Sequence, residues 1–191
     1  MRSFFLSILL LVRFSTVAQK EPNSFLNKLC QRYSNNIGES KGINLKLFIP
    51  CEWISMAIDI PHGIFKYNYK EFSSVLASET LVVANLGKTT DEDAKYLITE
   101  PGLRLMTKGA TGTYVSFKSL IVNDVKGGEV IIKNELNKSD GIYLNFITQD
   151  YFIYGRKIIL IQYAITSKSE LLCQKYLLLF NTLLNRSKIQ E

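Results

Sequence analysis

The side chains that could perform acid–base or nucleophilic chemistry are few and widely spaced in this 191-residue chain. His62 is the only histidine, and it lies in a Pro-His-Gly stretch that predicts a turn. A catalytic base needs a nucleophile beside it, and a catalytic thiol needs a base that generates the thiolate. The sequence places no such pair together, so we expect no catalytic residue. An enzyme of unfamiliar type that uses Cys51 or His62 is the alternative.

Motifs that define common enzyme and cofactor classes are absent from the sequence. It contains no G-x-S-x-G elbow, no phosphate-binding G-x-x-x-x-G-K-[ST] or G-x-G-x-x-G loop, no H-E-x-x-H and no C-x-x-C. Asp91, Glu92 and Asp93 gather three acids at a predicted helix start, where they interact favourably with the helix dipole. A cation site there would need a further acidic group, and none lies nearby in the sequence. We therefore expect neither a metal nor a cofactor.

Aromatic side chains are the remaining candidates for ligand contact. Trp53 is the only tryptophan, and Tyr143, Tyr151 and Tyr154 crowd one predicted hairpin. Packing against neighbouring strands explains such residues in most proteins. If several of them face solvent together, they form the kind of patch that marks a binding surface. Trp53, Tyr143, Tyr151 and Tyr154 are therefore the candidate ligand-binding residues.

The N-terminus has the pattern of a secretory signal peptide. Arg2 precedes an almost wholly apolar run over residues 4–12, and Thr16 and Ala18 fit the −3 and −1 positions of a cleavage site. The run is too short to span a bilayer, which takes about 20 apolar residues. A buried N-terminal helix is the alternative. We expect residues 1–18 to be removed, and residues 19–191 to form one domain that is exported to the periplasm or the extracellular space.

Charge and length limit the partners of the mature chain. Cleavage after residue 18 leaves 173 residues with 21 basic and 17 acidic side chains, a net charge of +4. The basic residues are spread along the chain and form no run that would follow a phosphate backbone. We expect a protein or small-molecule partner, no nucleic acid, and no stable membrane span after removal of the signal.

The three cysteines are Cys30, Cys51 and Cys173. Export to an oxidising compartment allows one disulfide with one thiol left over, in any of three pairings. Cys30 and Cys173 also share helical faces with apolar neighbours, as small core residues do. The sequence does not choose between a disulfide and three buried thiols.

Apolar periodicity and capping patterns divide the chain into helices and strands. A helix over residues 89–99 starts at Thr89 and ends before Pro101-Gly102, and residues 103–113 are expected to be a loop with at most a short helix. The polar tail, residues 186–191, is expected to fray. Two further helices are predicted over residues 23–34 and 167–185. Strands are predicted over residues 42–50, 53–60, 64–69, 80–86, 114–125, 129–136, 142–152 and 157–166.

The strands of the second half predict the architecture. Short glycine-containing links, among them Lys126-Gly127-Gly128, join them and favour antiparallel hairpins. Residues 158–161 (Ile-Ile-Leu-Ile) are apolar on both faces, which places their strand in the middle of a sheet with a layer on each side. We expect an α+β fold, an antiparallel sheet of about six strands with helices packed on its faces.

This order resembles the Mog1/PsbP-like α/β/α sandwich. In that group an early strand leads into a Pro-x-x-Trp turn, as Pro50 to Trp53 does here, and a late strand runs into a terminal helix, as residues 154–185 do. The resemblance covers about residues 43–186 and implies a non-catalytic binding or accessory domain. The function expected is binding of a protein partner or small ligand. A small-molecule carrier with an apolar cavity between sheet and helices is a further alternative.

Overall fold

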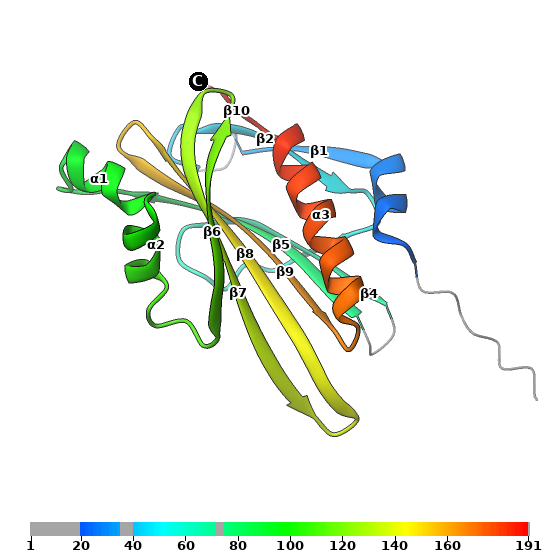
Figure 1. Ribbon diagram of the computed structural model, residues 1–191. Helices are drawn as coiled ribbons and strands as arrows, with labels where there is room; N and C mark the ends of the chain where they lie inside the picture. Colours follow the sequence, from blue (N-terminus) through cyan, green and yellow to red (C-terminus); the bar gives the residue numbers. More distant parts are fainter. Residues whose placement is uncertain (1–19, 35–39, 72–74, 191) are drawn as a thin grey trace, which may run out of the picture.

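The computed structural model describes residues 20–34, 40–71 and 75–190, so the predicted signal peptide, with Thr16 and Ala18, lies outside the described residues. Within them, seven strands form one antiparallel sheet (Figure 1). Its order is β3 (Ile54–Met56), β4 (Gly63–Glu71), β5 (Val75–Asn85), β9 (Lys157–Ser167), β8 (Gly141–Tyr154), β7 (Val125–Lys138) and β6 (Thr113–Val122). The predicted α+β class with antiparallel strands is confirmed.

A second, smaller sheet was not predicted. Its order is β1 (Leu29–Tyr33), β2 (Asn44–Pro50) and β10 (Lys188–Gln190), all antiparallel. The expectation of a frayed tail was wrong, because Ile189 pairs with Leu45 of β2 and is buried against the core. Backbone pairing and one apolar side chain thus order a tail whose composition is otherwise polar.

The apolar run at residues 158–161 lies in β9, the fourth of the seven strands, as predicted. Ile159 and Ile161 join the main core under α3 (Glu170–Arg186), whereas Ile158 and Leu160 pack in a second cluster on the opposite face. Consecutive residues of a strand point to opposite faces, so a strand that is apolar throughout needs cover on both.

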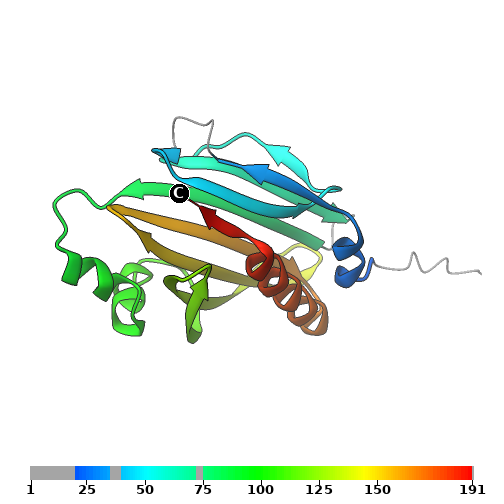
Figure 2. The ribbon, with the colours of Figure 1, turned by 90° about the horizontal axis from the view of Figure 1, so that it is seen from above.

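Helix α3 covers the main core together with the smaller sheet. The Ser169 hydroxyl accepts a hydrogen bond from the Leu172 amide at the helix start, so the cap is Ser169, two residues after Ser167, where the capping-box pattern Ser167-Lys168-Ser169-Glu170 would place it. Phe180 stacks on Tyr163 of β9 with ring centres 4.9 Å apart. Figure 2 shows α3 and the smaller sheet beside one another, with α1 (Asp91–Leu97) and α2 (Glu100–Met106) at the end of the molecule away from η1.

The helix expected over residues 23–34 was wrong. A short 3₁₀ helix, η1 (Pro22–Asn27), is followed by β1, in which Cys30 is the register partner of Ile49. Phe25, an apolar residue of the predicted helical pattern, is already buried by this short helix. Pairing with β2 stabilises the following residues as a strand. The few apolar residues at helical spacing would stabilise a helix there less.

The middle of the chain holds two short helices where one was expected. Thr90, rather than Thr89, caps α1, and its hydroxyl accepts from the Asp93 amide. The expected stop at Pro101 was wrong, because Pro101 lies in the first turn of α2, where a helix needs no amide donor. Residues 103–106, the start of the segment predicted as a loop with at most a short helix, therefore belong to α2.

Several strand boundaries also differ from the sequence prediction. The expected strand over residues 53–60 is reduced to β3, and the first predicted hairpin link lies inside β7. The turn before β7 is Asn123-Asp124, and both residues have positive φ. This is the geometry of a two-residue hairpin that matches the twist of its strands.

Candidate functional site

Trp53 is a core residue in the structure. Its side chain is 4% exposed, and its ring meets Phe25 and Phe180 edge-on with centroids 6.3 and 6.4 Å apart. The Trp53 amide also donates to the Pro50 carbonyl, which closes the predicted Pro-x-x-Trp turn. In this position the indole joins η1 to α3 and is not available to stack on a ligand.

The three candidate tyrosines do not form a common surface. Tyr143 is 1% exposed, with the ammonium groups of Lys138 and Lys168 over its ring and its hydroxyl donating to Asp140. Tyr151, eight residues along β8, is buried beneath α2, and Tyr154 is half-buried against the main core. The exposed aromatic patch that the hairpin suggested is therefore replaced by packing at separate places.

The cysteines are in two states. Cys30 and Cys51 form a disulfide, which joins β1 to the residue after β2, whereas Cys173 is free and buried. The prediction that Cys173 is a small core residue is confirmed, and the same reading of Cys30 was wrong. The Cys51 sulfur is engaged in this bond, so the oxidised protein presents no Cys51 thiolate.

His62 lies in the predicted turn and is exposed, with positive φ. Its Nδ1 is 3.1 Å from the Lys41 ammonium. The pair contains a base but no hydroxyl or thiol nucleophile. Within the described residues there is also no group of three His, Cys, Asp or Glu side chains that could hold a metal ion.

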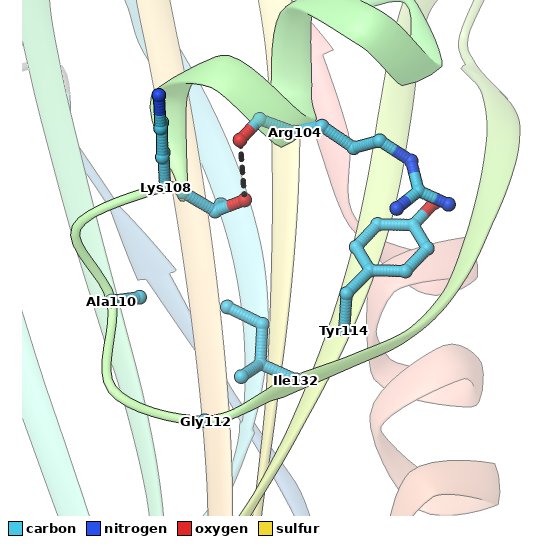
Figure 3. A pocket seen from close by; sticks show the side chains of 7 residues that line it. Arg104, Lys108, Ala110, Gly112, Tyr114 and Ile132 are labelled. Carbon is cyan, nitrogen blue, oxygen red and sulfur yellow. Dashed lines mark hydrogen bonds between the residues drawn. The ribbon is translucent and has the colours of Figure 1, made fainter.

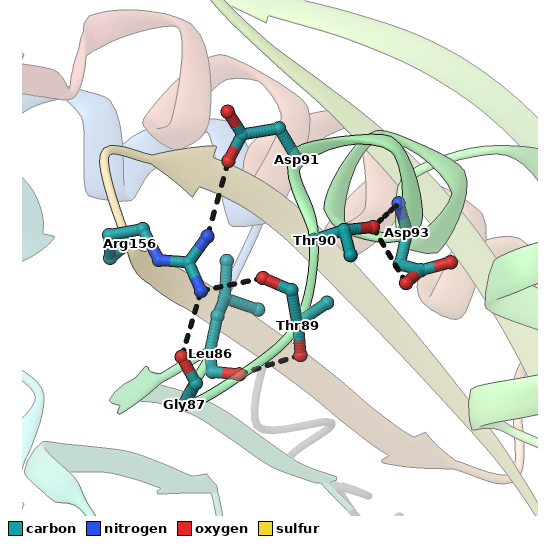
Figure 4. Close-up of polar contacts among 7 residues, drawn as sticks. All are labelled: Leu86, Gly87, Thr89, Thr90, Asp91, Asp93 and Arg156. Atoms are coloured by element: carbon teal, nitrogen blue, oxygen red, sulfur yellow. Dashed lines mark hydrogen bonds and ion pairs between the residues drawn. The ribbon is translucent and has the colours of Figure 1, made fainter.

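The acids at the start of α1 have structural partners. Asp93 accepts from the Thr90 hydroxyl, and Asp91 forms an ion pair with Arg156, which follows β8 (Figure 4). The Arg156 guanidinium also donates to the carbonyls of Gly87 and Thr89, at 2.8 and 2.5 Å. One side chain thereby fixes the loop before α1 to the β8–β9 turn.

Two glycines allow close packing of α2 on the end of α1 and of the α1–α2 segment on the sheet. A Cβ on Gly128 of β7 would lie 2.5 Å from the Ile98 carbonyl, and one on Gly102 would lie 2.1 Å from the Tyr96 carbonyl. Leu103 of α2 then reaches full burial against the sheet. Gly128 belongs to the stretch that the sequence assigned to a hairpin link, and its role is close packing.

Beside this contact lies an open apolar groove of about 490 Å³, which we call the α1–α2 groove. Ile98, Phe117 and Ile121 provide its apolar surface, and the Ile121 side chain is 68% exposed. Lys95 and Lys126 also line the groove. The other lining residues are Thr99, Glu100, Ser119, Leu120 and Gly127.

The single carboxylate that lines the groove is already neutralised. Glu100 accepts from Arg104 at 2.9 and 3.1 Å and from the Tyr114 hydroxyl at 3.1 Å. Hydrogen bonds from Arg104 and then Tyr114 lower the pKa of Glu100. Within the described residues neither Lys95 nor Lys126 forms an ion pair, so the groove presents two unpaired positive charges around an apolar floor.

The opposite side of α2 carries a smaller pocket of about 180 Å³ (Figure 3). The Arg104 guanidinium lies 3.7 Å from the centre of the Tyr114 ring, a cation–π contact. Lys108 and Ile132 also line the pocket. Because Arg104 is held by Glu100 and Tyr114, its charge is committed within the protein and leaves little to recognise an anion.

Three buried carboxyl groups lie on the α3 side of the large sheet. Glu79 and Asp150 are at most 1% exposed, and none of their oxygens has a hydrogen-bond partner in the described part of the chain. Burial raises the pKa of Glu79 to about 8. Burial, and then the charge of the adjacent Glu129, raises the pKa of Asp150 well above its usual range. These groups are sealed in the core and contact no surface pocket described above.

None of the ligand-binding residues predicted from the sequence lines the α1–α2 groove. Phe117 and Ile121 are four residues apart in one strand and so face the same side, which is a signal the sequence contains. The consecutive Gly127 and Gly128 inside an extended run are a second signal, since they mark a close approach of backbone. The position of α2, which creates the groove, was not predicted from the sequence.

No protein-family model and no curated protein matches the sequence. Solved structures do match in fold. LpqN of Mycobacterium tuberculosis, a protein involved in cell envelope biogenesis, shares 10% identity at a TM-score of 0.52, over 92% of this chain and 99% of LpqN. Cyanobacterial PsbP from Synechocystis sp. PCC 6803 (TM-score 0.49) and the Ran-binding protein Mog1p of Saccharomyces cerevisiae (0.47) each share 10% identity over 85% of this chain, and over 93% and 96% of their own.

The chain has the fold of the Mog1/PsbP-like group. The predicted resemblance is confirmed at that level. At 10% identity the likeness concerns the fold alone, and the residues of the α1–α2 groove are features of this chain. Among the described residues, no helix has the length and apolar character needed to cross a bilayer.

Proposed function

We propose that this chain is an exported, non-catalytic binding module that recognises a protein partner through the α1–α2 groove. The observation that carries the proposal is the groove itself, which is lined by a 68%-exposed isoleucine, Ile121, and by two lysines without ion pairs among the described residues. An apolar surface with a charged rim is the usual anatomy of a protein–protein interface. The partner surface is apolar at its centre and acidic around it.

The charges favour an acidic partner for a specific reason. Lys126 is the register partner of Ile121 across the β6–β7 hairpin, and Lys95 approaches the groove from α1. The one carboxylate of the lining, Glu100, is held by Arg104 and Tyr114 and does not offset these charges. A carboxylate placed beside Ile121 therefore gains two cations, whereas a cationic partner meets repulsion.

Strand β6 adds a second element to this surface. It is the edge of the seven-stranded sheet, ten residues long, and Ile121 and Phe117 project from it into the groove. An edge strand offers unpaired backbone groups along its length, to which an extended segment of a partner can add as a further strand. An extended acidic segment with one apolar side chain could pair with the β6 backbone and place that side chain in the groove.

Export is supported by two features that are independent of each other. Residues 1–18 have the pattern of a signal peptide, and Cys30 and Cys51 form a disulfide, a bond that persists in oxidising compartments. Intact-mass measurement of the exported protein tests this point. The expected mass is that of a chain beginning at Gln19 and lacking two hydrogen atoms relative to the fully reduced chain. An uncleaved N-terminus in cytosolic protein would refute export.

Capture by groove variants tests the binding function. Immobilised wild-type chain, Ile121→Asp, Lys95→Glu and a control, Leu178→Asp, are exposed to proteins of the compartment to which the chain is exported. Leu178 is 66% exposed on α3, so its substitution leaves the groove intact. A partner retained by wild type and Leu178→Asp, and lost from both groove variants, is expected. A protein retained equally by all four chains would count against the groove.

A further inference from the structure

A second exposed apolar surface lies at the other edge of the large sheet. From Ile54 to Ile60 every second residue is a large apolar one, and Ile54 and Met56 are 69% and 45% exposed. Ile58 and Ile60 continue the alternation at 36% and 41% exposure. In β3, which spans only Ile54–Met56, both large apolar side chains are exposed, although such side chains are usually buried.

The pairing of β3 with β4 places two lysines on the same surface. Met56 is the register partner of Lys66, and Ile54 is the partner of Asn68. Two residues further along β4, Lys70 pairs with Leu76 of β5, which is 42% exposed. Register partners and alternate residues share a face. We call this surface the β3 face: Ile54, Met56, Lys66, Lys70 and Leu76.

No helix that the structure describes covers the β3 face. Helix α3 packs on the opposite face of the sheet, against Tyr163 and its neighbours. Helix α2 lies on the same face as the β3 face but at the β6–β7 end, where it packs on Val130 and Ile132. The strand order places β6 and β3 at opposite edges, so the groove and the β3 face are separate surfaces.

The charge of the β3 face has one sign. Lys66 and Lys70 form no ion pair with any described residue, and the intervening positions of β4 and β5 on this face are the neutral Asn68, Ser78 and Thr80. Asp59 lies beyond the end of β3, between Ile58 and Ile60, and is not a residue of this face. Two copies joined by this face would oppose lysine to lysine, and β3 offers only three residues for edge pairing.

We propose that the β3 face docks the protein on the surface of an anionic phospholipid bilayer. Its lysines contact lipid phosphates, and Ile54, Met56 and Leu76 enter the interface between headgroups and acyl chains, as the apolar side of an interfacial helix does. Two lysines and three apolar side chains give reversible attachment without a membrane span. This activity is independent of the partner groove.

Vesicle binding by the full chain tests the proposal. Sedimentation with phosphatidylcholine vesicles, with and without phosphatidylglycerol, is compared for wild type, Lys66→Glu/Lys70→Glu, Ile54→Asn, and the control Leu178→Asn on α3. Residues 1–19, which include Arg2 and Arg13, are the same in every chain, so any affinity of that segment for either vesicle is common to all four chains and cancels in the comparison between them. Unfolding midpoints of all four chains establish that each is folded.

Wild type is expected to prefer the phosphatidylglycerol vesicles by about tenfold or more, with the preference lost in the double lysine variant and reduced in Ile54→Asn. The Leu178→Asn control is expected to bind as wild type does. Equal binding to both vesicle types, or a preference that survives Lys66→Glu/Lys70→Glu, would overturn the proposal. So would a concentration-dependent dimer that Ile54→Asn abolishes, because a second copy would then cover the β3 face.

Discussion

Glu79 of β5 and Tyr163 of β9 are register partners in the interior of the protein, and both side chains are 0% exposed. Neither the Glu79 oxygens nor the Tyr163 hydroxyl has a hydrogen-bond partner among the residues described. Burial raises the pKa of Glu79 to about 8 and that of Tyr163 well above its usual range. Both groups are therefore neutral at pH 7, and the core contains a protonated carboxyl.

Protein stability should fall as pH rises because of Glu79. The folded-state pKa, about 8, lies above the unfolded value near 4.5, so the folded protein binds the proton more tightly. Stability from this group is complete below about pH 4.5 and is lost progressively up to about pH 8. Each unit of pKa difference corresponds to about 1.4 kcal/mol, so the loss of unfolding free energy from this group is at most about 5 kcal/mol.

The Glu79→Gln variant isolates this effect. Urea unfolding at about pH 5 and about pH 9 is expected to show a large loss of stability in wild type and a smaller one in Glu79→Gln. The variant should be the more stable of the two at the higher pH, since it never places a charge in the core. Parallel pH profiles for the two proteins would contradict a buried, neutral Glu79.

The Cys30–Cys51 disulfide should stabilise the domain against unfolding. It closes a loop between residues 21 positions apart, for which chain entropy gives about 3 kcal/mol. Cys51→Ser or a reductant is expected to lower the free energy of unfolding by about that amount, with no further loss when both are applied. Cys173→Ala is the control, because it removes the free thiol and should leave the response to reductant intact. A wild-type chain indifferent to reductant would exclude the bond.

Helix α3 offers a matched pair of substitutions for the core. Phe180 is 1% exposed and packs on Tyr163, Tyr176 and Trp53, whereas Leu178 is 66% exposed two residues earlier. Phe180→Ala should cost about 3–5 kcal/mol in urea unfolding, through lost burial and a cavity. Leu178→Ala should change stability by less than about 0.5 kcal/mol. A similar loss of stability in the two variants would mean that α3 does not turn Phe180 to the core and Leu178 to solvent.

Gly128 should be required for the docking of α2. Its missing side chain leaves room for the Ile98 carbonyl, which a Cβ would approach to 2.5 Å. Gly128→Ala is expected to cost about 1–3 kcal/mol and to increase hydrogen exchange of the α2 amides. Gly109→Ala, where a Cβ meets nothing within 4 Å, should do neither. Faster exchange confined to other elements would show that Gly128 does not hold α2.

The fold could be predicted as far as local patterns determine it. The two-sided apolar run at residues 158–161 placed β9 at the centre of the sheet, and apolar residues at helical spacing predicted α3. Predictions failed where long-range pairing decides the structure. Cys30 lies in a strand because Ile49 pairs with it, and Ile189 is ordered because β2 lies beside it. Neither partner is visible in the periodicity of the segment itself.

The candidate site was harder to predict for a similar reason. Aromatic side chains were the natural candidates, yet Trp53 and Tyr143 are buried by elements distant in the sequence. The α1–α2 groove depends on Pro101 beginning a helix rather than ending one. A proline fits both roles, and packing of Leu103 on the sheet selects between them.

Site-specific photo-crosslinking tests the central claim, that the α1–α2 groove binds an acidic protein segment. The photoreactive p-benzoyl-phenylalanine is incorporated at position 121 of the exported chain, alone and with Lys95→Glu/Lys126→Glu, and at position 178 as a control. We predict a crosslink from position 121 to a partner segment rich in Asp and Glu, lost with the lysine reversals and absent at position 178. A crosslink that survives the reversals, or one that joins position 121 to a basic segment or to a second copy of this chain, would contradict the account.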